Sequence, residues 1–187
     1  MQFNSKEKLD GKALRELFAW RDQLVIDSQQ VNLLNRIGDE ICFRARFYAY
    51  VRLSEEPVER NGRTMLKPGT NVTFFTLQTT NGDTFYPVFT DQEEIARWKT
   101  VKESDPRMVI VDFTDFLPIL KSSETLKGIV INPMSENFLI PRRSAEQWTE
   151  QRQRIVGQVR EQAKKAREAK DPAVEAGKVV RIPHPSK

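Results

Sequence analysis

The chain has 187 residues, of which 39% are hydrophobic and 30% charged, with a mean hydropathy of -0.57. This length fits one domain with an appendage or two very small domains. No apolar run approaches the roughly 18 residues of a membrane span, and the first residues lack the apolar segment of a secretory signal. The only cysteine, Cys42, excludes an internal disulfide and favours a reducing compartment, so we predict a cytoplasmic protein.

Positive charge is concentrated near the C-terminal end. Residues 141–187 contain 12 Lys and Arg against 6 Asp and Glu, a net charge of +6, whereas residues 1–140 contain 18 against 20, a net charge of -2. We therefore expect an electrostatic footprint for nucleic acid or an acidic surface only in the C-terminal segment.

Two helices are expected before the first strand. Apolar residues recur at helical spacing over residues 6–22, which predicts an amphipathic helix weakened near its start by Gly11. A second short helix is predicted over residues 28–37, with Gly38 as its stop. From residue 41 the period changes to two, because "ICFRARFYAYVRL" is rich in aromatic and β-branched residues and is typical of a strand.

Two Asn-Gly pairs indicate turns, because both residues tolerate positive φ. The pair at residues 61–62 predicts an exposed hairpin or loop. The pair at residues 81–82 predicts a hairpin between strands at 71–80 and 84–89. Pro87 has no N–H, so we expect its strand to lie at an edge or an end where that donor is not required.

Two short helices flank a predicted buried strand. "TDQEEIARWK" has the spacing of a capping box between Thr90 and Glu93, which predicts a helix that Thr90 caps. "MVIVDF" follows as the buried strand. "FTDFLPIL" then starts a second helical segment with Asp112 or Thr114 as its cap, and Pro118 lies early in it or kinks it.

The last predicted elements are a hairpin and a long helix. "GIVINPMSENFLIP", residues 128–141, predicts two strands joined by a turn that begins at its Asn-Pro pair. Ser144 and Gln147 again have capping-box spacing, which predicts a helix over about residues 145–170.

Together these elements predict an α+β fold, with a mixed or mainly antiparallel sheet of about five to six strands, short helices and a long C-terminal helix. Residues 1–40 are expected to be a helical segment of the same domain as residues 41–148. Residues 149–187 are expected to be a basic helix and tail.

Three blocks in this order resemble the N-terminal domain of the SseB-like family, which is named for enhanced serine sensitivity. The blocks are "PVFTD" with a tryptophan one helix later, "DFTDFLPIL" and "GIVINPMSENF", and they span about residues 41–141. Longer members of the family carry a second domain, where this chain has only a basic helix and tail. The resemblance implies a bacterial cytoplasmic protein with this fold, and it transfers no reaction, catalytic residue or cofactor.

The inventory of reactive side chains is small. His184, the only histidine, lies between two prolines in the tail, which excludes a Ser-His or Cys-His pair and a histidine general base in the body. One cysteine and one histidine cannot form a zinc framework, and no phosphate-binding glycine motif occurs. We therefore favour a noncatalytic protein-interaction module without a cofactor, which binds an unknown protein partner or self-associates.

Two alternatives remain open. Five carboxylates near predicted strand ends could hold Mg²⁺ in an enzyme, although capping and solvation explain them more simply: Asp91, Glu93, Glu94, Asp112 and Asp115. The basic C-terminal helix could bind nucleic acid or an acidic surface. The simpler interpretation of that helix is a solvated one whose charges are balanced by neighbours four residues away.

The candidate contact residues lie in the turn of the last hairpin and directly after it. Asn132, Glu136 and Asn137 belong to the turn, and polar loop residues on a rigid sheet often serve recognition. Arg142 and Arg143 follow the second strand and complete the set. The simpler interpretation of the turn residues is that they only reverse the chain.

Overall fold

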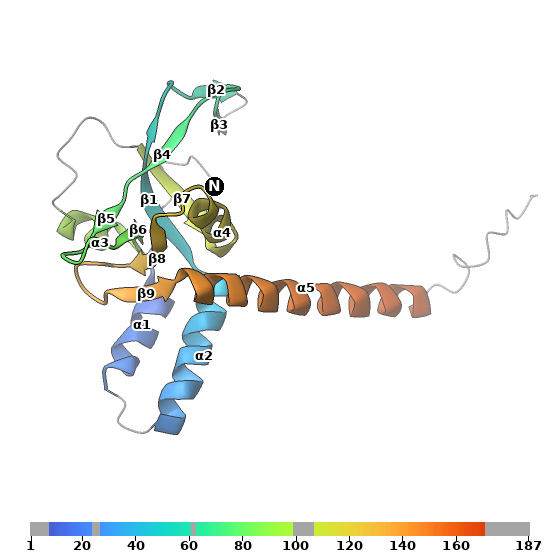
Figure 1. Cartoon of the computed structure of the whole chain (residues 1–187). Coiled ribbons are helices and arrows are strands. Elements are labelled where there is room, and N and C mark those ends of the chain that lie inside the picture. The colour runs from blue at the N-terminus through green and yellow to red at the C-terminus, as the bar shows by residue number, and fades with distance from the viewer. Residues whose placement is uncertain (1–7, 24–26, 61–62, 99–106, 171–187) are drawn as a thin grey trace, which may run out of the picture. The chain divides into compact units, whose positions relative to one another are not determined.

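The computed structural model describes residues 8–23, 27–60, 63–98 and 107–170 (Figure 1). The chain divides into two units, Met1–Glu150 and Gln151–Lys187, which we describe separately. The predicted α+β class is confirmed, because the first unit combines helices with antiparallel and parallel strand pairs. The long helix α5 (Arg142–Lys170) begins in the first unit and continues into the second.

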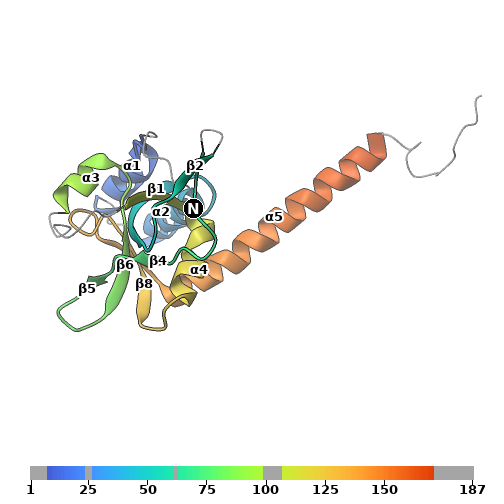
Figure 2. The same cartoon turned by 90° about the horizontal axis from the view of Figure 1, so that it is seen from above.

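The strands of the described residues form two larger sheets and a separate hairpin. In the first sheet, β1 (Arg46–Leu53) is flanked by β4 (Val72–Phe74) and β7 (Arg107–Asp112), both antiparallel to it. The second sheet has the order β5 (Leu77–Gln78), β6 (Thr84–Val88), β8 (Leu126–Ile131) and β9 (Phe138–Pro141). In this sheet only β6 and β8 are parallel, and Figure 2 shows β5, β6 and β8 side by side. The separate hairpin consists of β2 (Val58–Arg60) and β3 (Arg63–Met65).

The two larger sheets meet at β1. Tyr48 and Phe89 exchange two backbone hydrogen bonds of 2.8 Å each, which joins β1 to the chain just after β6. Side chains alternate along a strand, so Phe47 and Val51 enter the main core while Tyr48 lies on the other face. There Tyr48 packs with Phe89 and Ile110 in a second, smaller core. β1 is therefore covered on both faces.

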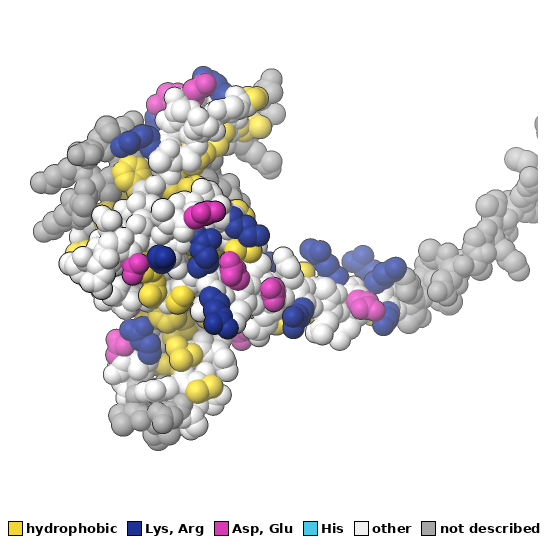
Figure 3. All heavy atoms as spheres, viewed as in Figure 1, with side chains coloured by type: hydrophobic (Ala, Val, Ile, Leu, Met, Phe, Trp, Pro, Cys, Tyr) yellow, Lys and Arg dark blue, Asp and Glu magenta, His cyan; other side chains and the backbone are white. Residues whose placement is uncertain are grey.

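Among the described residues of the first unit, four helices pack together with the start of α5. They are α1 (Lys12–Arg21), α2 (Asp27–Phe43), α3 (Gln92–Arg97) and α4 (Phe113–Lys121). Helices α1 and α2 lie side by side (Figure 1) and bury one apolar face each in the main core. Hydrophobic side chains gather over α1 and β9 (Figure 3), where the rings of Phe18 and Phe138 stack at 5.0 Å.

The prediction that Gly38 ends the second helix is wrong, and the strand expected from residue 41 begins at Arg46. Helix α2 continues through Gly38 to Phe43 and buries Ile41 completely. Burying an isoleucine side chain contributes about 1.5–3 kcal/mol, whereas a glycine inside a helix costs about 1 kcal/mol. The tertiary contact therefore outweighs the local signal.

Three predicted helix starts are also corrected. The first described helix begins at Lys12 and not near residue 6, because Gly11 in front of it has a φ of 55°. Helix α3 is capped by Asp91 and not by Thr90, whose amide and hydroxyl are bonded elsewhere. Helix α5 begins at Arg142, so Ser144 lies in its first turn and caps nothing; β9 runs directly into the helix. The cap predicted at Asp112 for α4 is confirmed.

The hairpin predicted around residues 81–82 is confirmed for a shorter segment. Only Leu77 and Gln78 pair with β6, whereas β4 pairs with β1 in the other sheet. Strand β5 pairs only with Thr84 and Phe85 of β6, so no residue of β5 lies opposite Pro87. This suits proline, which has no backbone N–H to donate to a neighbouring strand. The turn at residues 61–62 lies outside the described residues, but β2 and β3 on either side of it are antiparallel as expected.

Candidate functional site

The turn between β8 and β9 is held by the backbone of Asn132. Its amide donates to the Val88 carbonyl at 2.9 Å, and its carbonyl accepts from the amides of Ser135 and Asn137 at 3.1 and 2.9 Å. Asn132 and Asn137 both have positive φ, 49° and 45°, a conformation that asparagine tolerates better than most residues. The turn is therefore tied to β6 and shaped by two left-handed asparagines.

The Asn132 side chain is fully buried and joins this turn to the start of α3. Its Oδ1 accepts from the Thr90 amide at 3.0 Å, and its Nδ2 donates to Thr90 Oγ1 and to Glu136 Oε2, both at 2.9 Å. An amide side chain supplies an acceptor and two donors together. Among the common turn residues, asparagine is thus well suited to this position.

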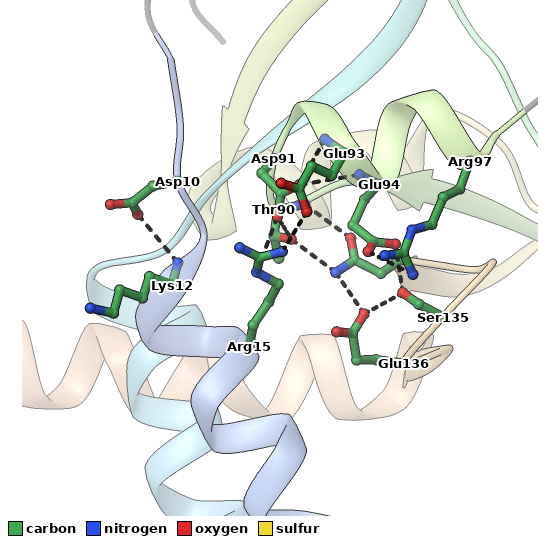
Figure 4. A network of polar contacts seen from close by, with 11 residues as sticks. Asp10, Lys12, Arg15, Thr90, Asp91, Glu93, Glu94, Arg97, Ser135 and Glu136 are labelled. Carbon is green, nitrogen blue, oxygen red and sulfur yellow. Dashed lines mark hydrogen bonds and ion pairs between the residues drawn. The ribbon is translucent and has the colours of Figure 1, made fainter.

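Asp91 continues the network into α3 and toward α1 (Figure 4). Its carboxylate accepts from Thr90 Oγ1 at 2.8 Å and from the amides of Glu93 and Glu94 at 2.9 and 3.1 Å. Arg15 of α1 lies 3.4 Å from the same carboxylate and 3.3 Å from that of Glu93. The buried carboxylate is thus both a helix cap and an ion-pair partner, which offsets its desolvation.

Glu94 and Glu136 meet at the hydroxyl of Ser135. Ser135 Oγ lies within hydrogen-bond distance of both carboxylates, and a serine hydroxyl has one proton to donate. The side chain of Glu94 is 2% exposed, and Arg97 lies 3.5 Å from its second oxygen. The network thus connects α3 to the β8–β9 turn through charged as well as neutral groups.

Gly11 brings the start of α1 against this network. A Cβ atom at Gly11 would lie 2.5 Å from Thr90 Cβ, and the φ of 55° also favours glycine. Beside this contact is a hollow of about 290 Å³. Its polar lining is mixed in charge: Lys8, Asp10, Lys12, Glu40, Arg44 and Arg46.

The candidate contact residues lie at opposite ends of the β8–β9 hairpin. Asn132, Glu136 and Asn137 share the turn, whereas Arg142 donates to the carbonyls of Leu126 and Ser123 at the other end, each at 2.7 Å. Arg143 is exposed next to Arg142. Six residues of β8 separate the two ends, about 20 Å at 3.3 Å per residue. The structure therefore does not bring the five residues into one site.

The five carboxylates of the Mg²⁺ hypothesis fall into two groups. Asp91, Glu93 and Glu94 surround the start of α3. Asp112 and Asp115 form the capping box of α4, in which the Thr114 amide donates to Asp112 at 2.7 Å. Within the described ranges, no three His, Cys, Asp or Glu side chains form a group that could hold a metal ion.

The chain matches a known protein family over more than half of its length. The family model described as the SseB protein N-terminal domain matches residues 40–145. The chain belongs to the SseB family. The match contains the part of the network between Thr90 and Glu136 but not Arg15, and neither curated proteins nor solved structures give a match. No helix among the described residues meets the length and apolarity needed for a membrane span.

Three members of the network in this SseB domain are absent from the sequence-based candidates. The sequence predicts Thr90 only as a helix cap, and it assigns no contact to Ser135 or Arg15. The residue pair Thr90 and Asn132 is 42 positions apart, so no local spacing reveals it. The sequence shows a Thr-Asp pair before a helix and an Asn-Pro turn, but nothing in it indicates that these two features are bonded to each other.

Tyr86 is a further residue whose environment the sequence does not reveal. Its side chain is fully buried, and its hydroxyl has no hydrogen-bond partner among the described residues. Burial raises the pKa of the Tyr86 phenol above its ordinary value of 10.0, and the negative charge of Asp115 raises it further. This hydroxyl is an exception to the satisfied polar groups around Asn132.

Beyond the family match, α5 carries an apolar stripe. Trp148 is its first member and packs in the first unit, where its ring centroid lies 6.3 Å from that of Phe113. Residues 7 and 11 positions further share its helix face. These are Ile155 and Val159, which are 36% and 58% exposed. The stripe thus continues into the second unit with exposed aliphatic side chains.

Proposed function

We propose that this SseB-family chain is a noncatalytic protein-interaction module that binds a partner protein through α5. The observation that carries the proposal is the exposure of Ile155 and Val159 on the helix face that Trp148 begins. Exposed aliphatic side chains at helical spacing are typical of a helix that packs against another protein. Because the two side chains are 36% and 58% exposed, covering them contributes about as much as burying one aliphatic side chain, roughly 1.5–3 kcal/mol in all.

The polar groups of the first unit support the noncatalytic part of the proposal. Asn132, Asp91 and Glu94 are buried, and each is hydrogen-bonded to another part of the chain. The carboxylates of the Mg²⁺ alternative are divided between two helix caps. Within the proposal, the exposed Asn137 and Arg143 and the half-buried Glu136 add polar contacts, whereas Asn132 and Arg142 hold the hairpin ends in place.

The proposal also assigns residues 1–148 to one domain and residues 149–187 to a basic interaction segment, and it places the protein in the bacterial cytoplasm. Cys42 supports this location, because it is the single cysteine of the sequence and is buried in the main core. A thiol without a disulfide partner fits a reducing compartment.

The test compares two double variants of the full chain. Ile155→Gln/Val159→Gln removes the stripe, and Glu161→Gln/Lys165→Gln is the control, because it removes an ion pair of 3.0 Å and leaves the net charge unchanged. A protein captured from the source cells is purified, and its dissociation constant for each variant is measured. We expect the stripe variant to bind at least about tenfold more weakly, equivalent to about 1.4 kcal/mol, and the control to bind as the wild type does.

Two results contradict the proposal. Equal binding by both double variants shows that the stripe is not the contact surface. Reproducible turnover in a broad substrate and cofactor screen, abolished by a single substitution in the first unit, shows that the protein is an enzyme. Sedimentation of the purified chain alone separates binding of a partner from self-association.

A further inference from the structure

We draw no further inference here: the strongest candidate, the apolar patch around the exposed Leu139 on the face of the second sheet that is turned away from the main core, carries none, because nothing among the described residues shows what covers it.

Discussion

Asn132 has an amide side chain and is fully buried, whereas Val159 has an aliphatic side chain and is 58% exposed. The first belongs to a unit in which buried polar groups are bonded to one another across α1, α3 and the β8–β9 turn. The second belongs to a helix on which Ile155 and Val159 are exposed among the described residues. The difference is one of burial: the Thr90–Asn132 network is bonded inside the first unit, whereas α5 leaves two aliphatic side chains of its stripe, Ile155 and Val159, exposed.

The largest expected effect concerns the Thr90–Asn132 network. Asn132→Gly keeps a residue that accepts the φ of 49° but removes three side-chain hydrogen bonds and leaves the buried Thr90 amide unpaired. Because an unpaired buried donor alone costs about 1–3 kcal/mol, we expect a total loss of about 3 kcal/mol. Urea denaturation followed by tryptophan fluorescence measures this loss.

Asn137→Gly is the matched control, because Asn137 has a similar φ of 45° and is exposed. We expect its free energy of unfolding to stay within about 0.5 kcal/mol of the wild type. If the two variants have equal urea midpoints, the buried amide does not stabilise the first unit and the comparison with α5 loses its basis.

The sequence predicts those parts of this network that depend on neighbouring residues. Asn132-Pro133 predicts the turn, and Asp112 predicts the cap of α4, because both signals act within a few positions. Thr90 and Asp91 are both good capping residues, and the choice between them depends on Asn132, 42 positions away. Local spacing could therefore predict a cap but not which residue forms it.

The helix boundaries also depend on contacts between residues that are not neighbours in the sequence. Gly38 is a stop signal in the sequence, but the burial of Ile41 extends α2 beyond it. The period-two pattern of β1 is correct from Phe47 onward, where both faces are covered. The stripe of α5 is readable from periodicity alone, because its members lie within three helical turns of one another.

Tyr86 tests whether the first unit tolerates a buried polar group without a partner. Tyr86→Phe removes a hydroxyl that has no partner among the described residues, so we expect a gain of about 1 kcal/mol. Tyr48→Phe is the matched substitution with the opposite sign. The Tyr48 hydroxyl accepts from the Leu9 amide at 2.8 Å, and losing it should cost about 1 kcal/mol.

The pH dependence of Tyr86 has a definite sign. Its pKa is raised in the folded state, so the folded protein keeps the proton when the unfolded chain begins to lose it above the ordinary value of 10.0. The wild type therefore loses stability as the pH rises above this value, and the advantage of Tyr86→Phe should widen between pH 9 and about pH 11. An advantage that is constant over this interval contradicts the raised pKa.

The smallest expected effect compares two glycines inside helices. Gly157 lies in the α5 portion of the second unit, where an added Cβ meets no atom within 4 Å. At Gly38 in α2 an added Cβ lies 3.7 Å from Trp148, which is an ordinary contact. Alanine favours the helix over glycine by up to about 1 kcal/mol at either position. Because α2 packs in the main core, Gly38→Ala should raise the urea midpoint. Gly157→Ala should leave that midpoint unchanged and slow hydrogen exchange only in α5, since the added methyl group meets no described atom within 4 Å. A shift of the midpoint by Gly157→Ala would mean that the two regions unfold together.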